Sequence, residues 1–116
     1  MITTQRQVRR DVLGVNDVGS TILWGIAEDG VLNGGDRLSA LIDNKNGAQI
    51  LNVTIWVQTT RDDIFVADPT VIPCAAATQT TIELLDLANY AMRFTGQYAA
   101  ANNDTVTVSV EVKALP

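Results

Sequence analysis

The side chains that most often perform chemistry in proteins are sparse in this chain. It contains no histidine and a single cysteine, Cys74. Histidine is the commonest general base and the commonest zinc or copper ligand, so its absence excludes Ser/His and Cys/His nucleophile pairs and an ordinary zinc site. Cys74 stands between Pro73 and three alanines, without a neighbouring base or cation. We therefore expect a small buried thiol that is unreactive.

The carboxylates do not form a convincing catalytic or metal-binding pattern either. Asp62 and Asp63 are adjacent, so on a strand their side chains point to opposite faces and cannot face each other across a cleft. The segment 43–47 is rich in Asp and Asn, but Lys45 occupies a position at which a calcium loop needs an acid or amide. Phosphate-binding glycine motifs and the Gly-x-Ser-x-Gly motif are absent. We expect no catalytic residue, no metal and no cofactor, and hence a protein that is not an enzyme.

The charge distribution points to protein partners. The formal net charge is −5, with eight basic and thirteen acidic side chains. Arg6, Arg9 and Arg10 give the first ten residues a charge of +3, which leaves −8 for the rest. An acidic body repels phosphates, so we expect no direct nucleic-acid binding. No apolar run approaches the roughly 20 residues of a transmembrane helix, so we expect no membrane partner.

Apolar and polar residues alternate in short runs separated by turn signals, which is typical of a small all-β domain. We expect an antiparallel β-sandwich or jelly roll of about seven to eight strands, without a long helix. The alternation is clearest near residues 49–59 and 105–113. In the expected strand 20–27, Ile22 and Trp24 should lie on one face of the strand and Leu23 on the other. The expected strands are 20–27, 36–42, 49–59, 64–67, 71–72, 78–85, 90–98 and 105–113, and the expected core contains Val53, Ile55, Val57, Val106, Val108, Val110 and Val112.

The first 19 residues lack a continuous periodic pattern, because Gly14 and Gly19 interrupt it. We expect an extended N-terminal arm, residues 1–19, attached to a sandwich domain of residues 20–116. A short basic arm suits docking on an acidic neighbouring surface, although it could equally be a solvated terminus. The residues of the arm that we expect to bind a partner are Arg6, Val8, Arg9, Arg10, Val12 and Leu13.

Two further features could belong to a binding surface. Trp56 lies on the polar face of its expected strand, either as a second-layer core residue or as an exposed binding aromatic. Residues 70–82 include no charged side chain. Because charged residues are depleted in the centres of interfaces, this stretch could pack against another subunit, or it could be an ordinary buried strand and loop.

The second half of the chain carries a recognisable succession of elements. A strand over residues 49–58 is followed by a polar corner, a threonine-rich strand, and a corner of the form Asp-Leu-x-x-Tyr-Ala-x-Arg that leads into the penultimate strand. A closing Thr-Val-Thr-Val-Ser-Val strand completes it. The corner is formed by Asp86, Leu87, Ala88, Asn89, Tyr90, Ala91, Met92 and Arg93. Residues 49–114 thereby resemble the small β-sandwich structural proteins of tailed bacteriophages, including capsid decoration or cement proteins.

This resemblance implies a virion structural protein that binds without catalysis. Its partner would be the major capsid protein or another virion protein, and it would form a homo-oligomer, a dimer or a trimer. It would be assembled in the host cytoplasm and end on the outer capsid surface of the virion. Because a fold does not determine a function, a carbohydrate-binding or adhesin-like module is the alternative. Two or more exposed coplanar aromatic rings would favour that alternative.

Overall fold

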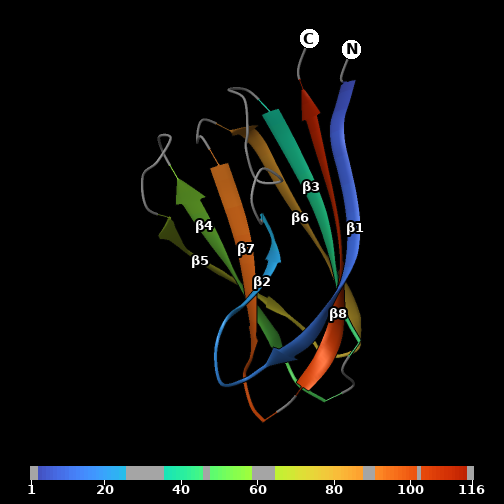
Figure 1. Cartoon of the computed structure of the whole chain (residues 1–116), viewed down its shortest axis with the longest axis vertical. Helices are drawn as coiled ribbons and strands as arrows, with labels where there is room; N and C mark the ends of the chain where they lie inside the picture. Colours follow the sequence, from blue (N-terminus) through green and yellow to red (C-terminus); the bar gives the residue numbers. More distant parts are fainter. Residues whose placement is uncertain are drawn as a thin grey trace.

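The chain folds into two four-stranded antiparallel sheets packed face to face (Figure 1). The computed structural model describes residues 3–25, 36–45, 48–58, 65–87, 91–101 and 103–114. In these ranges every regular element is a strand. The strands are β1 (Thr3–Asn16), β2 (Thr21–Trp24), β3 (Asp36–Asn44), β4 (Leu51–Gln58), β5 (Val66–Cys74), β6 (Thr78–Leu87), β7 (Ala91–Tyr98) and β8 (Asn103–Ala114).

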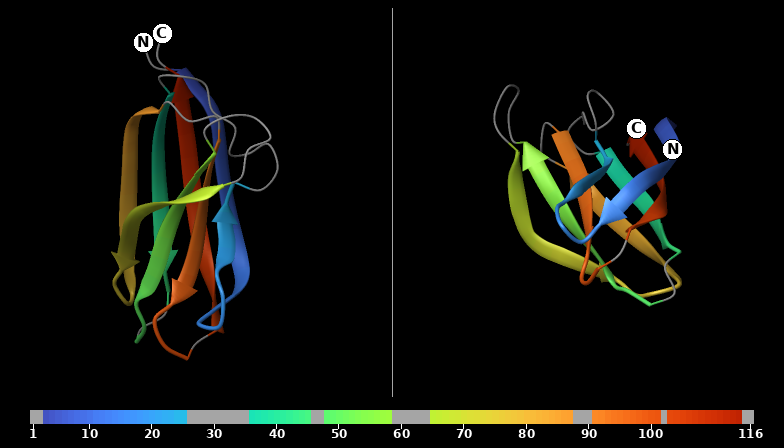
Figure 2. Two further views of the ribbon diagram at one scale, coloured as in Figure 1. Left: turned by 90° about the vertical axis from the view of Figure 1, so that its left-hand side faces the viewer. Right: turned by 60° about the horizontal axis from the view of Figure 1, so that its bottom comes forward.

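The strand order is that of a jelly roll. One sheet has the order β1-β8-β3-β6 and the other β2-β7-β4-β5. The first strand therefore pairs with the last, the second with the seventh, the third with the sixth and the fourth with the fifth, as if one long hairpin had been wrapped into a sandwich. Both views in Figure 2 show the two layers. The expected all-β fold and its number of strands are confirmed.

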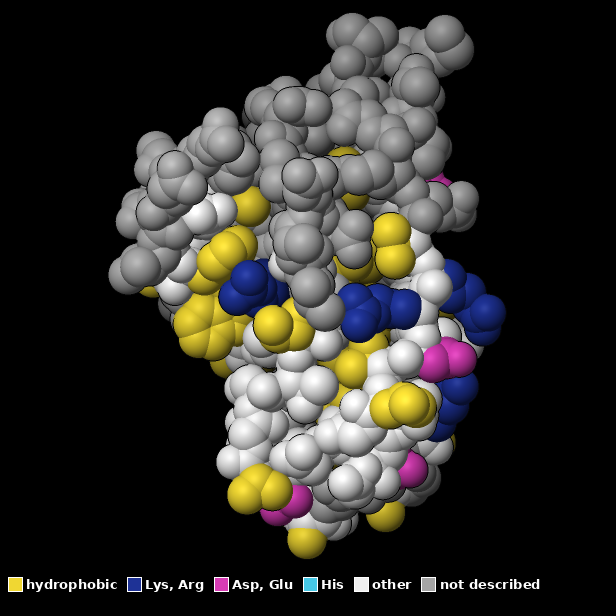
Figure 3. All heavy atoms as spheres, in the orientation of Figure 1, with side chains coloured by type: hydrophobic (Ala, Val, Ile, Leu, Met, Phe, Trp, Pro, Cys, Tyr) yellow, Lys and Arg dark blue, Asp and Glu magenta, His cyan; other side chains and the backbone are white. Residues whose placement is uncertain are grey.

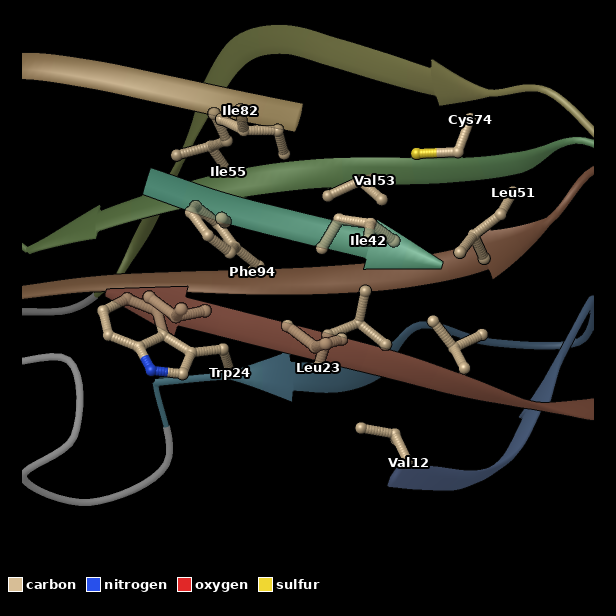
Figure 4. Packing of buried hydrophobic residues seen from close by; sticks show 14 of the residues in the cluster. Val12, Leu23, Trp24, Ile42, Leu51, Val53, Ile55, Cys74, Ile82 and Phe94 are labelled. Carbon is tan, nitrogen blue, oxygen red and sulfur yellow. The ribbon is translucent and has the colours of Figure 1, made fainter. Parts of the chain in front are cut away.

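The core lies between the inner faces of the two sheets, where side chains from both layers meet (Figure 4). In β4, the alternate residues Leu51, Val53 and Ile55 are buried, as the pattern predicted, whereas Val57 is partly buried and packs against the core. The four expected valines of β8 are buried as well. Each fully buried side chain of this size contributes roughly 1.5–3 kcal/mol. The largest buried side chains are Trp24, Tyr98 and Phe94, and the rings of Trp24 and Phe94 lie 5.4 Å apart.

The N-terminal segment is part of the sandwich, which differs from the arm that we expected. β1 pairs with β8 from Thr3 to Asn16 and forms an edge of its sheet. The pairing is irregular between Val12 and Val15, where Gly14 has a φ of 70°. This bulge inserts a residue into the alternation, so Val12 and Val15 both face the core. A pattern read without the bulge loses its period at Gly14, which is why the strand was not evident in the sequence.

Bulges also explain two other differences from the expected strands. β2 is irregular between Ile22 and Trp24, and Leu23 and Trp24 are consequently both buried, although we expected them on opposite faces. Two short runs were expected at 64–67 and 71–72; residues 66–67 and 71–72 belong to one strand, β5, and Ile64 lies outside the described residues. The register of β5 jumps around Pro69, which cannot donate a ladder hydrogen bond.

A buried polar cluster lies where β3, β5 and β7 end and β4 begins. The Asn44 amide, at the end of β3, donates to the carbonyls of Gln49 (2.9 Å), Cys74 (3.1 Å) and Ala75 (3.2 Å). The Tyr98 hydroxyl donates to Asn44 Oδ1 at 3.2 Å. One asparagine thereby joins the ends of β3, β5 and β7 and fixes the start of β4.

Candidate functional site

The charge-free stretch noted in the sequence lies on one lateral side of the molecule. It consists of the end of β5, the turn at 75–77 and the first half of β6. β5 and β6 are the outermost strands of their two sheets and lie on the same side of the sandwich (Figure 2). We call residues 71–82 the uncharged edge.

Most side chains of the uncharged edge face solvent. Cys74 and Ile82 are buried and fix the two strands to the core. Val71 is 52% exposed, and Val66, earlier on the same strand, is 55% exposed. The other exposed residues of this surface are Pro73, Ala75, Ala77, Thr78, Gln79 and Thr81. The stretch is therefore not the buried strand and loop that we held as the alternative, and it presents an uncharged surface of two neighbouring edges.

The turn between the two edge strands is held by local contacts. The Thr78 hydroxyl donates to the carbonyl of Ala75 at 2.7 Å, and the Asn44 amide reaches the same carbonyl from the core. Ala77 adopts a φ of 55°, a conformation that costs an alanine free energy. The turn keeps β5 and β6 in a defined relation, so the surface they present is preformed.

Cys74 anchors this turn, and its thiol is shielded from solvent. Its side chain is buried, and desolvation raises the pKa of the thiol above its ordinary value, partly offset by a hydrogen bond with Thr80. A raised pKa keeps the thiolate population low at neutral pH. The expectation of a buried structural cysteine is confirmed for its position.

Trp56 lies on the outer face of its sheet and is half-buried. Its indole Nε1 donates to the hydroxyl of Thr95 on β7 at 2.8 Å. The residue opposite it on β7 is Arg93, whose guanidinium lies 4.1 Å from the centre of the Phe65 ring. These contacts place Trp56 in a small cluster of side chains on the outer face of the sheet, where it remains partly accessible to solvent.

On the described surface, Trp56 and Phe65 both lie beside Arg93, and both are half-buried. The one ring pair among the described residues, Trp24 with Phe94, lies in the core. The Phe65 ring is stacked with Arg93, and Tyr90 lies outside the described residues. The exposed coplanar rings that a sugar-binding module would use are therefore not found in the part of the chain that is described.

The residues expected to bind through the N-terminal segment are separated by the structure. Val8 packs against the core and Val12 is buried in it, so both stabilise the domain itself. Arg9 and Leu13 are exposed, Leu13 by 75%. Arg10 is half-buried, and the side chain of Arg6 lies outside the described residues, although its backbone pairs with Val112. The expected site therefore does not form one continuous apolar and basic surface.

A shallow hollow of about 340 Å³ crosses the outer face of the sheet formed by β1, β8 and β3. Its polar lining consists of Arg9, Glu111, Ser39 and Ser109. Next to it, the Thr107 hydroxyl donates to Asp11 Oδ1 at 2.7 Å, and this bond lowers the pKa of the Asp11 carboxyl. The carboxylate of the lining, Glu111, lies opposite Ser39 across the two strands and pairs with Lys113 Nζ at 2.8 Å.

Within the described ranges, no group of three or more His, Cys, Asp or Glu side chains is placed to hold a metal ion. The same residues contain no helix that is long and apolar enough to cross a membrane. On the face shown in Figure 3, basic side chains lie in a band across the middle, and the lower part is mainly uncharged polar side chains and backbone, with scattered hydrophobic and acidic side chains.

Comparison with known proteins supports the fold of the chain and does not identify its family. No protein-family model and no curated protein sequence matches the chain. Among solved structures, it is similar to a chain of the disulfide-linked pili of Bacillus endospore appendages, with 11% identity and a TM-score of 0.63 over 97% of this chain and 86% of that chain. It is also similar to a mitogen derived from Yersinia pseudotuberculosis, with 12% identity and a TM-score of 0.54 over 95% of this chain and 86% of that chain. At identities this low, the structural similarity shows a shared β-sandwich architecture and no more. The resemblance to phage virion proteins therefore remains a hypothesis.

Proposed function

We propose that this chain is a non-enzymatic structural subunit that assembles with other protein subunits through its uncharged edge. The observation that carries the proposal is that the charge-free stretch 71–82 is exposed on two adjacent edge strands. Charged residues are depleted at the centre of protein interfaces, and solvent-facing strands otherwise tend to carry charge that prevents association. A chain with 18% charged residues in which residues 71–82 carry no charge is suited to contact another protein through that stretch.

The assembly that we propose is non-covalent. The similar Bacillus chain belongs to disulfide-linked pili, so a sandwich of this type does occur as a subunit of a fibrous assembly. This chain has one cysteine, and Cys74 is fully buried. It cannot link subunits in the folded state, so strand and side-chain contacts would have to hold the assembly together.

The specific form that we propose is a capsid decoration protein. The resemblance of residues 49–114 to phage structural proteins supports it, with the major capsid protein or another virion protein as the partner and the outer capsid surface as the location. A jelly roll is also a recurrent architecture of viral capsid proteins. A carbohydrate-binding module is less well supported, because the described surface has no cluster of exposed rings.

The test is sedimentation of particles isolated from the source of the gene, with and without a change in the uncharged edge. Wild-type protein should sediment with the particles. Val71→Lys should remain in the supernatant, because it places a charge in the proposed interface at a side chain that is already 52% exposed. Val18→Lys is the matched control, because Val18 is 88% exposed but lies outside the uncharged edge. Equal sedimentation of both variants, or a wild-type protein that is absent from every particle fraction, would refute the proposal.

A further inference from the structure

The two sheets together have four edge strands, and three of them carry features that prevent strand addition. β1 has register shifts at two places, and Arg10 lies on the same face as Val8 and Val12, half-buried. β2 has four residues and a register shift. β5 contains Pro69 and Pro73, and its register jumps around Pro69. Prolines, bulges, inward charges and short length are the usual means by which proteins keep an edge from pairing.

β6 lacks these features over most of its length. From Thr78 to Leu84 it pairs with β3 without a register shift and contains no proline. The single charge in this segment is Glu83. Such an edge is long, regular and nearly uncharged, and its outward-facing backbone N–H and C=O groups form a template for another strand. The segment also supplies a large part of the uncharged edge.

The sequence of this segment is complementary to itself. In an antiparallel pair, residues directly opposite each other project to the same face of the sheet. If two identical β6 strands pair around a two-fold axis and continue the sheet, the axis must therefore pass beside one residue, which faces its own copy. Thr81 is the midpoint of the regular segment, so centring on it pairs the whole of Thr78–Leu84. Thr81 then faces Thr81 of the second copy, and Gln79 faces Glu83 of the second copy on the exposed side. This arrangement keeps the two Glu83 carboxylates apart and gives each an amide donor.

We propose that two copies of this chain pair through β6, antiparallel and centred on Thr81, to form a continuous eight-stranded sheet. This inference rests on the proposed assembly function and names a second copy as the partner at β6. On the side of the pair that continues the outer face, Thr–Thr and Gln–Glu contacts would line the junction. On the inner side, Thr80 would face Ile82 of the second copy. An interface of one strand pair is small, so the dimer should be weak and dependent on concentration.

The first experiment tests the register by chemical cross-linking of purified protein at high concentration. Thr81→Cys should be joined to itself by a thiol cross-linker shorter than about 10 Å, because opposed Cβ atoms lie about 5 Å apart. Gln79→Cys alone and Glu83→Cys alone should not be cross-linked. In each variant the two identical cysteines of the dimer lie four residues apart along the strands, about 13 Å. An equal mixture of these two variants should cross-link. Wild type is the background control, because Cys74 is buried.

The second experiment tests the energetics by analytical ultracentrifugation. Thr81 is exposed, so Thr81→Lys should leave the monomer folded while weakening the dimer by about fivefold or more, because two like charges would face each other. Thr81→Glu should do the same. Mixing the two variants should restore a dimer at least as strong as that of the wild type. Val18→Lys, far from β6 along the chain and 88% exposed, should dimerise like the wild type.

A monomeric wild type over the accessible concentration range would overturn the inference, and so would cross-linking of all the cysteine variants to a similar extent. The inference would also be overturned if a mixture of Thr81→Lys and Thr81→Glu formed no dimer. These measurements use purified protein without particles. A dimer in a protein that never enters particles would therefore refute only the proposed association with particles. Particle association of a strictly monomeric protein would refute only the β6 pairing.

Discussion

At the scale of single residues, Asp11 and Thr107 connect the edge strand β1 to its neighbour β8. The Thr107 hydroxyl donates to Asp11 Oδ1 at 2.7 Å, and this hydrogen bond lowers the pKa of that carboxyl from its ordinary value. A lowered pKa in the folded state means that the contact stabilises the fold above the unfolded pKa and loses this effect as the pH falls through the folded one. Because Asp11 is exposed, solvent limits the size of the contribution.

Removing the hydroxyl should therefore raise the pKa of Asp11. In Thr107→Val the carboxyl titration measured by NMR should move up toward the ordinary value, because the main cause of the depression is lost. The stability difference between this variant and wild type should become smaller as the pH falls below 4. Thr105→Val is the control, since Thr105 also lies on β8, and it should leave the Asp11 titration where it is. An unchanged Asp11 titration in Thr107→Val would contradict this assignment.

Ala77, in the turn of the uncharged edge, gives a second test at this scale. Its φ of 55° is strained for alanine, and glycine adopts it freely. Glycine also costs entropy in the unfolded chain, about 0.4–1 kcal/mol. Ala77→Gly should thus be neutral or stabilising by up to about 1 kcal/mol, whereas Ala76→Gly, which has no positive φ to relieve, should be destabilising by about 0.5–1 kcal/mol. Urea unfolding measures both, and equal destabilisation would show that the turn is not strained.

At the scale of elements, the bulge at Gly14 determines which residues of β1 belong to the core. Val15 is fully buried and Leu13, on the other side of the glycine, is 75% exposed. Val15→Ala should lower the free energy of unfolding by about 2 kcal/mol, through lost burial and a small cavity. Leu13→Ala removes a larger side chain but should change stability by less than about 0.5 kcal/mol. Similar losses measured in urea would mean that residues 1–19 do not pack in solution as the structure has them.

The same bulge shows which part of the fold was predictable from the sequence. β4 and β8 alternate without interruption, and their core residues could be identified in advance, apart from the incomplete burial of Val57. β1 and β2 contain bulges, and there the period of two fails locally, as at Leu23. No propensity rule places such an insertion, because it is determined by how the strand meets its neighbour across the sheet. The uncharged edge was visible as a charge-free stretch, but its exposure depends on strand order, which a linear pattern does not contain.

At the scale of the whole molecule, the jelly roll makes β8 a central strand of its sheet. β8 pairs with β1 on one side and β3 on the other. Strands at both ends of the chain therefore depend on it, and the contacts that hold them are far apart in sequence. A fold built from such long-range contacts loses its native state as one unit when a central strand is disrupted.

Val108 and Ser109 are adjacent on β8, so the same substitution at each position distinguishes cooperative unfolding of the whole domain from a local effect. Val108 is fully buried, so Val108→Asp places an unpaired charge in the core at a cost of several kcal/mol, against a total stability of about 5–15 kcal/mol. We expect it to lack a cooperative thermal transition and the near-ultraviolet circular dichroism of packed Trp24. Ser109→Asp introduces the same side chain one residue later, on the half-buried outer face, and should retain both signals. A folded Val108→Asp variant, or equal loss in both, would contradict the placement of β8 at the centre of the sandwich.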